Sequence, residues 1–151
     1  MREITEERDI QELMRLCAGF HDSCIVSAGY SSGAFVDESN GMGNGEPLEH
    51  TLELVLHSQL CRPIKLLFKG VRKFSVIGWR DNYFCDIFGA YLAFHSGLLG
   101  RCRDDRLIVW SDSESFDPSL YAEDSLLSSR GSTYVVAEKL FWEINYEAGE
   151  K

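Results

Sequence analysis

Basic residues are scarce in this chain. Its 151 residues include 15 Lys and Arg against 24 Asp and Glu, which gives a formal net charge of −9 at pH 7. A nucleic-acid-binding domain needs clustered Lys and Arg to neutralise phosphates, and the densest basic stretch, from Lys65 to Arg80, is interleaved with apolar residues. We therefore expect no nucleic-acid partner. The acidic surplus favours a basic protein partner, or it simply keeps the protein in solution.

Long apolar runs and a regular cysteine pattern are also lacking. The N-terminal segment MREITEERDIQELMRL is charged from its second residue and has no apolar run of the about 7–15 residues found in signal peptides. No stretch approaches the roughly 20 apolar residues of a membrane span. The five cysteines are odd in number and irregularly spaced, unlike a disulfide framework. These absences predict a cytoplasmic protein with reduced thiols and no contact with membranes.

The chain begins with a predicted amphipathic helix and continues with predicted strands. Ile10, Leu13, Met14 and Cys17 follow helical spacing and form one apolar stripe, and Gly19 is a natural stop. After Gly19 the apolar period changes to two residues, which is typical of strands with one solvent-facing side. The predicted strands are Cys24–Tyr30, Thr51–His57, Ile64–Lys69, Val71–Ile77, Phe84–Phe94, Arg106–Trp110 and Thr133–Ile144.

This pattern predicts an α+β, mostly β fold in a single domain over residues 1–151. We expect an antiparallel sheet or sandwich of six to seven strands with one N-terminal helix, because no second amphipathic helix separates the strands. The glycine-rich segment Asp37–Pro47 and most of Ser111–Arg130 are predicted to be loops. Alternation assigns the even-numbered residues of Phe84–Phe94 to one face. It also assigns Tyr134, Val136, Leu140, Trp142 and Ile144 to one face.

The residues Phe20-His21-Asp22-Ser23 join the predicted helix to the first strand. A His beside a carboxylate can act as a general acid or base. Adjacent residues of an extended chain point in different directions, so these residues do not form a Ser-His-Asp triad. In the structural alternative, Phe20 is buried and anchors the helix, while His21 and Asp22 bond to the backbone of the turn.

Other candidate residues are acidic or aromatic. Asp112, Glu114 and Asp117 could meet a basic partner, but they lack the spacing of an EF-hand. Trp79 and Trp110 belong to a residue type common both at interfaces and in cores. The set His21, Cys24, His57 and Cys61 contains zinc-ligand types without a C-x2-C knuckle. The loop Gly41–Gly45 lacks the strand-to-helix context of a phosphate-binding loop. We therefore predict no metal and no cofactor.

The order of these motifs resembles a family of small bacterial proteins. A helix, the FHDS motif at 20–23, the L-x-L-x-L strand at 52–56 and the stretch LLFKGVRKFSV at 66–76 are similar to immunity proteins of polymorphic toxin systems, of the immunity protein 50 type, and to uncharacterised Firmicute relatives. The similarity covers about residues 10–95, with a weaker part at Tyr134–Glu143. It implies a non-enzymatic protein that binds and neutralises a toxin. An acidic inhibitor suits a basic nuclease toxin.

Three functions remain open at this point. The first, which we predict, is a non-enzymatic protein-binding module, including the immunity type. The second is a small enzyme or small-molecule-binding protein that uses His21 and Asp22. The third is a structural domain that forms a homodimer or larger homo-oligomer through an exposed edge strand. The candidate binding residues are His21, Asp22, Trp79, Trp110, Asp112, Glu114 and Asp117.

Overall fold

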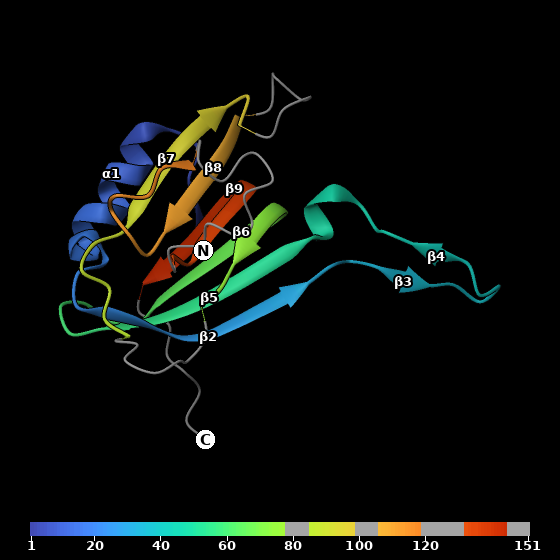
Figure 1. Ribbon diagram of the computed structural model, residues 1–151, viewed down its shortest axis with the longest axis horizontal. Helices are drawn as coiled ribbons and strands as arrows, with labels where there is room; N and C mark the ends of the chain where they lie inside the picture. The colour runs from blue at the N-terminus through green and yellow to red at the C-terminus, as the bar shows by residue number, and fades with distance from the viewer. Residues whose placement is uncertain (78–84, 99–105, 119–131, 145–151) are drawn as a thin grey trace.

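The computed structural model describes residues 1–77, 85–98, 106–118 and 132–144 (Figure 1). Within them the fold is mostly β and antiparallel with one α-helix at the N-terminus, which confirms the predicted fold class. The elements are β1 (Arg2–Glu3), α1 (Glu7–Leu16), the 3-10 helix η1 (Ala18–Phe20), β2 (Ser23–Ser31), β3 (Phe35–Val36), β4 (Met42–Gly43), the 3-10 helix η2 (Pro47–Glu49), β5 (Thr51–Ser58), β6 (Ile64–Ser75), β7 (Tyr91–Ser96), β8 (Arg106–Ser111) and β9 (Tyr134–Ile144).

Seven strands form one sheet, which settles the alternative between a sheet and a sandwich. Its order is β2-β5-β6-β9-β8-β7, and β1 adds to β9. Strand β9 pairs with β6 along its whole length, from Ile144 opposite Ile64 to Tyr134 opposite Ser75. Its other edge is shared, because β8 pairs with the first residues of β9 and β1 pairs with Phe141 and Trp142. The long β6–β9 pair therefore joins a β2 half of the sheet to a β7 half.

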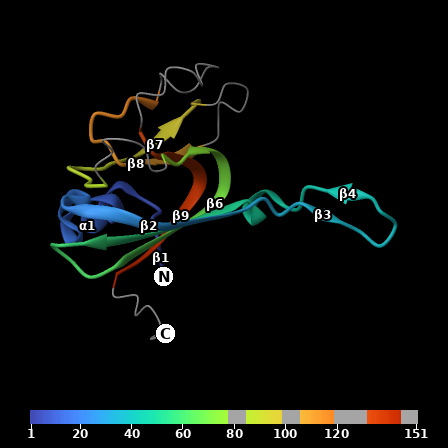
Figure 2. The same ribbon diagram turned by 60° about the horizontal axis from the view of Figure 1, so that its bottom comes forward.

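The sheet bends where these two halves meet. Gly70 has a φ of +65°, and the register between β6 and β9 shifts between Val71 and Lys73. Such a bulge turns a strand and increases its twist. Figure 2 shows β6 and β9 curving strongly from the β2 half towards β7 and β8. The two outer strands of the sheet are also linked, because the first residue of β2, Ser23, forms an antiparallel bridge with Ile87, four residues before β7. The Ile87 N–H donates a hydrogen bond to the Ser23 carbonyl at 2.8 Å.

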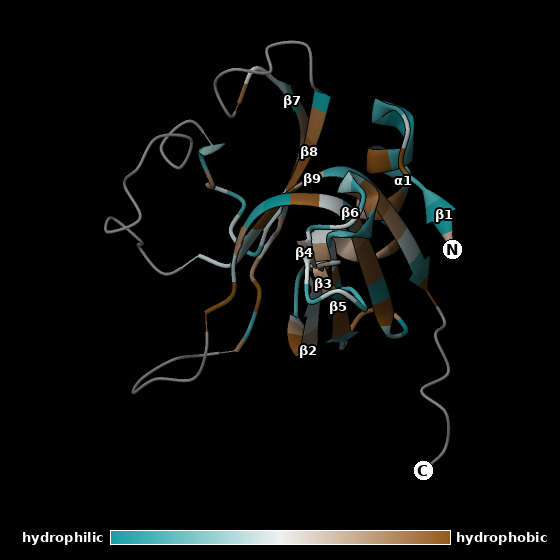
Figure 3. Ribbon diagram, turned by 90° about the vertical axis from the view of Figure 1, so that its right-hand side faces the viewer, coloured by the Kyte–Doolittle hydropathy of each residue, from teal (hydrophilic) through white to brown (hydrophobic). Residues whose placement is uncertain are grey.

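The predicted helical stripe forms one side of the main core. Ile10, Leu13 and Cys17 are buried against the concave face of the bent sheet, together with Phe20. A second, smaller cluster lies on the opposite face of β8 and β9. Strand β8 is therefore covered on both faces, and its ribbon is coloured as hydrophobic over most of its length in Figure 3. The expectation of one solvent-facing side is right for β5 and wrong for β8.

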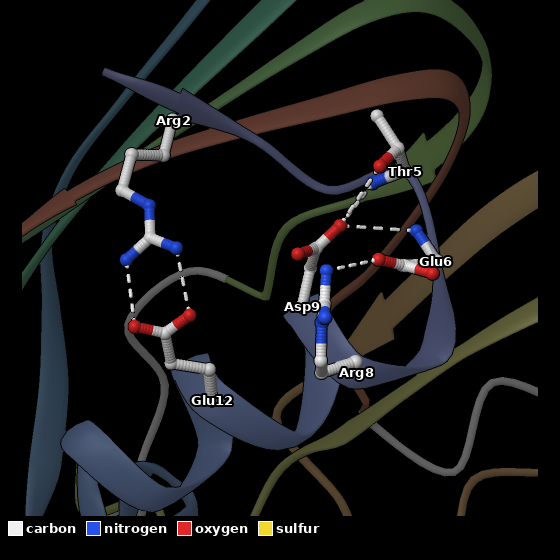
Figure 4. Close-up of polar contacts among 6 residues, drawn as sticks. All are labelled: Arg2, Thr5, Glu6, Arg8, Asp9 and Glu12. Atoms are coloured by element: carbon white, nitrogen blue, oxygen red, sulfur yellow. Dashed lines mark hydrogen bonds and ion pairs between the residues drawn. The ribbon is translucent and has the colours of Figure 1, made fainter.

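Polar contacts fix the start of α1 and attach β1 to it (Figure 4). The Asp9 carboxylate accepts hydrogen bonds from the Thr5 N–H at 2.8 Å, the Thr5 hydroxyl at 2.9 Å and the Glu6 N–H at 3.1 Å. These bonds hold the pKa of Asp9 below its ordinary value. The Arg2 guanidinium donates two hydrogen bonds of 2.7 Å to the Glu12 carboxylate. Free helix N–H groups and the helix dipole both favour a carboxylate in the first turn.

Two predicted strand patterns are wrong in their faces or limits. Strand β7 begins only at Tyr91. On the predicted even-numbered face, Ala90 and Leu92 are buried and Phe94 packs against the main core, as predicted, whereas Phe88 is exposed and the odd-numbered Ile87 is buried; Phe84 lies outside the described residues. The chain before β7 crosses to bond with Ser23 rather than extending the strand. In β9, Tyr134 and Val136 belong to the second cluster while Leu140 and Trp142 face the main core.

Two loop or strand limits also differ from the prediction. The predicted strands Ile64–Lys69 and Val71–Ile77 form the single strand β6, because Gly70 bends the strand without ending it. The predicted loop Asp37–Pro47 contains strand β4, and η2 begins at its last residue.

Candidate functional site

The FHDS turn is a structural junction with a polar outer surface. Ala18, Gly19, Phe20 and Asp22 all have φ between +50° and +63°. This left-handed conformation is unfavourable for residues other than glycine, so the surrounding structure must hold it. The Asp22 N–H donates to the Ile87 carbonyl at 2.9 Å, and the Asp22 carbonyl accepts from the Gln59 N–H at 3.0 Å. The turn therefore ties β2 to two other segments.

The side chains of His21 and Asp22 lie outside this junction. His21 Nδ1 is 3.0 Å from Asp22 Oδ2, and the two side chains are 50% and 39% exposed. Phe20 and Ser23, by contrast, are buried. Neither His21 nor Asp22 lines the pocket that Asp112 forms with β2. Phe20 is thus buried, as the structural alternative predicted. The side chains of His21 and Asp22 form a pair that is partly exposed to solvent.

Trp110 is in the core, so the core interpretation of this residue is right and its place among the candidate binding residues is wrong. Its side chain is fully buried, with its ring edge-on to Phe20 at 5.8 Å between centroids. The indole Nε1–H has no hydrogen-bond acceptor in the described part of the chain. The alternation of β8 points this residue towards α1 rather than outwards. The other predicted tryptophan, Trp79, lies outside the described residues.

The three predicted acidic residues do not form one cluster around a ligand. Glu114 and Asp117 are exposed, whereas Asp112 is half-buried. Across the described ranges, no group of three His, Cys, Asp or Glu residues is arranged to hold a metal ion. Cys24 and His57 are opposite each other on β2 and β5, and those same ranges supply no third ligand. Asp112 therefore differs from the other two acids in its burial.

Asp112 lines a pocket that the sequence did not indicate. The pocket has a volume of about 340 Å³ and lies between β2, the two residues that follow β6 and the residues before β7. Asp112 Oδ1 accepts a hydrogen bond of 3.0 Å from the Thr133 N–H, and the Thr133 hydroxyl oxygen accepts one of 3.0 Å from the Ile77 N–H. Burial raises the pKa of Asp112 to about 6. The lining residues are Ile25, Val26, Ser27, Ala28, Val76, Ile77, Cys85, Ile87 and Asp112.

Replacing Asp112 with asparagine is expected to stabilise the protein at neutral pH. A carboxyl whose folded pKa is about 6, against an ordinary value of 3.8, stabilises the fold below pH 4 relative to higher pH, and this contribution disappears as the pH rises to 6. The asparagine side chain keeps an Oδ1 acceptor and never ionises. With allowance for partial exposure, the gain at pH 7.5 is about 1–2 kcal/mol. Urea unfolding at pH 3.5 and 7.5 checks it, and equal differences at both pH values would contradict it.

A two-stranded arm projects from the body of the protein. Strands β3 and β4 pair with each other and extend away from the sheet, as both Figure 1 and Figure 2 show. Phe35, Val36 and Met42 are 55%, 64% and 90% exposed. The Phe35 ring lies directly over Gly43 and leaves no room for a Cβ there. The arm thus carries apolar side chains that the described body does not cover.

The tip of the arm is an ordered turn. The Asp37 carboxylate accepts hydrogen bonds from the Ser39 hydroxyl at 2.7 Å, the Gly41 N–H at 2.8 Å and the Ser39 N–H at 2.9 Å, which lower the pKa of Asp37. Asn40 has a φ of +63°. Asn-Gly between two short apolar segments is a strong hairpin signal. Asn40-Gly41 is therefore the signal in the sequence that could have identified this arm.

The arm belongs to a part of the sequence whose charged residues are all acidic. From residue 16 to residue 61 there is no Lys or Arg. The same stretch contains six acidic residues, and it supplies β2, the arm and β5. These six are Asp22, Asp37, Glu38, Glu46, Glu49 and Glu53. The edge of the molecule formed by this stretch therefore favours contact with positively charged surfaces.

Comparison with known proteins identifies no relative. No family model, no curated protein and no solved structure matches this chain. None of the helices in the described ranges is long and apolar enough to span a membrane. The arm and the Asp112 pocket are therefore the features on which a function can be proposed.

Proposed function

We propose that this protein is a cytoplasmic protein-binding domain that captures a basic protein partner through the β3–β4 arm, and that it acts as an immunity protein that neutralises a toxin. The exposed Phe35, Val36 and Met42 on a projecting ribbon are the observation that carries this proposal. The motif order that resembles immunity proteins supports the toxin as the class of partner. The acidic stretch supports a partner of opposite charge.

Physical reasons favour contact by the arm. An isolated two-stranded ribbon is at best marginally stable in water, and this one exposes three large apolar side chains. Their burial against a partner would contribute about 25 cal/mol per Å² of apolar surface. Met42 has a flexible and polarisable side chain that adapts to irregular surfaces. Asp37 fixes the tip before binding, so less conformational freedom is lost on association.

Charge gives the arm its preference for a basic partner. Asp37 and Glu38 lie at the tip, and Glu46 and Glu49 lie at the base. The Glu49 carboxylate is held by the Glu46 N–H at 2.7 Å. Acidic groups around an apolar centre speed the encounter with a basic surface and reject acidic ones. Binding should therefore weaken as salt concentration rises.

Serine at both Phe35 and Met42 is expected to weaken partner binding by at least about 30-fold, the size of an interface hot spot. Purified wild-type protein should recover one basic partner at a 1:1 ratio from the native host, and isothermal titration with that purified partner gives the affinity. The matched control is Phe88→Ser, because Phe88 is 71% exposed but lies outside the arm. Unchanged affinity in the double variant would exclude the arm as the contact surface.

The immunity role requires a separate measurement. Expression of the recovered partner alone should arrest bacterial growth, and co-expression of the wild-type chain should restore it, whereas the arm double variant should not. A partner that does not affect growth would leave a protein-binding domain without the immunity function. Self-association in light scattering, with no second protein recovered, would instead make the arm a homodimer contact.

A further inference from the structure

The strand β2 lies at the edge of the sheet and has an exposed backbone. It pairs with β5 on one side, and on the other side the described chain pairs with it only at Ser23, through the bridge to Ile87. From Val26 to Ser31 every residue of β2 is exposed. Edge strands with unpaired N–H and C=O groups are templates for the addition of another strand.

The Asp112 pocket lies beside this edge strand, which the described chain leaves unpaired on one side beyond Ser23. Four consecutive residues of β2, Ile25 to Ala28, line it. Successive side chains of a strand point to opposite faces, so a pocket lined by four in a row is bordered by the strand's backbone edge as well as by side chains. Val76, Ile77 and Ile87 form an apolar wall elsewhere in the pocket. A register shift between Ile25 and Ser27 places a bulge at Val26, which changes the direction of its side chain.

The carboxylate of Asp112 gives this apolar groove a negative charge. Thr133 donates to it through its N–H. The ionisable lining groups are Asp112 and the Cys85 thiol, and no Lys or Arg is among the described lining residues. The Asp112 pocket, which we call the groove, is thus lined mainly by apolar side chains and contains the Asp112 carboxylate. It lies beside a strand edge that can form backbone hydrogen bonds. A small number of placed polar groups in an apolar pocket is typical of specific binding sites.

We propose that this groove binds an extended segment of the protein partner, which adds to β2 as a further strand, places an apolar side chain among Ile25, Val76 and Ile87, and places a Lys or Arg at Asp112. Strand addition gains affinity from main-chain hydrogen bonds and specificity from pockets for alternate side chains. The occupant is basic because Asp112 is the carboxylate among the described lining residues and because residues 16–61, which include β2, contain six acidic residues and no Lys or Arg. This inference rests on the proposed protein-binding function and adds a second contact to the arm.

The probe is the peptide acetyl-Lys-Ser-Val-Ser-Lys-amide, whose Lys and Val side chains share one face when it is extended; it is titrated into ¹⁵N-labelled protein at pH 7.5 and followed by NMR. Shifts of the amides of residues 25–28 are expected, together with slower hydrogen exchange there. Acetyl-Glu-Ser-Val-Ser-Glu-amide should bind at least tenfold more weakly, as should the Lys peptide with its two serines N-methylated. Asp112→Asn should weaken the Lys peptide at least tenfold while remaining folded. Val26→Lys should weaken it too.

Each result either supports or overturns the proposal. Shifts confined to residues outside the groove would overturn it, as would equal binding of the acidic peptide or equal binding by Asp112→Asn. The arm double variant Phe35→Ser/Met42→Ser should bind the peptide like the wild type. That result separates a failure of the groove from a failure of the proposed contact through the arm.

Discussion

Replacing Phe20 with alanine is expected to lower the free energy of unfolding by about 3–5 kcal/mol, in the range measured for large-to-small changes of buried aromatics. Phe20 is fully buried, and its ring packs edge-on against Trp110, which is also fully buried. Truncation removes this contact and leaves a cavity between α1 and the sheet. The loss is not offset by relief of backbone strain, because alanine at a φ of +62° is strained as well.

Urea unfolding with a fixed m value measures this difference. Phe88→Ala is the matched control, since the same atoms are removed from a side chain that is 71% exposed; it should change stability by no more than about 0.5 kcal/mol. A loss below about 1 kcal/mol for Phe20→Ala, far under the usual cost of truncating a buried aromatic, would mean that the FHDS turn does not anchor the core.

Replacing Gly70 with valine is expected to lower the free energy of unfolding by about 2–4 kcal/mol, from two causes. The left-handed conformation at a φ of +65° disfavours a branched side chain by about 1–2 kcal/mol. A Cβ at this position would also lie 2.8 Å from the Cβ, Cγ and Cδ of Glu138, and overpacking of this kind adds about 1–3 kcal/mol. Gly70 lies where the two halves of the sheet meet, so a shift of the strand would disturb both halves.

Gly29→Val provides the control for this glycine. Gly29 is on an exposed strand, has no positive φ, and has no atom within 4 Å of an added Cβ. Valine there should leave stability unchanged or raise it by up to about 1 kcal/mol, because glycine loses more backbone freedom on folding. Equal effects of the two substitutions in thermal unfolding would show that the bend at Gly70 is not required for the fold.

Local patterns predict the elements close to where they form. The helical spacing of Ile10, Leu13 and Cys17 produces α1 and its buried face, because a single apolar stripe has to be covered by another layer. The alternation of Leu52, Leu54 and Leu56 likewise produces β5 with these three residues buried. These predictions succeed because the period of a helix or a strand is a property of consecutive residues.

Predictions fail where they assume that alternate residues face the same side along the whole length of a strand. A single alternation along Thr133–Ile144 predicts one buried face, but the core-facing positions change between Ala137 and Leu140, opposite the bend in β6. The predicted strand before β7 fails for a related reason, because the backbone of Ile87 is used to tie the sheet to Ser23. Register and closure depend on partner strands that lie far away in the sequence.

For the candidate sites, the sequence indicates the residue types, but it does not show their burial or their neighbours. The sequence indicates Asp112 as an acidic residue, but it does not show that Asp112 is more buried than Glu114 and Asp117 and lines an apolar pocket. Trp110 could not be removed from the candidate binding residues on sequence alone, because the sequence does not show that β8 is covered on both faces. The arm is hidden in a segment whose glycines and acids resemble a loop, although Asn40-Gly41 marks its turn.

Sequence by itself determined that this protein is an acidic, mostly β domain with one leading helix, and that the FHDS residues join the helix to the sheet. Composition and short-range periodicity are sufficient for this, since each reflects which neighbouring side chains can be buried together. Only the tertiary structure decided that the sheet bends at Gly70 and is tied at Ser23 and Ile87. The bent sheet places β2, the residues after β6 and Asp112 around one pocket. Local sequence cannot show this, because these segments are distant in the chain and come together only through the complete set of strand pairings.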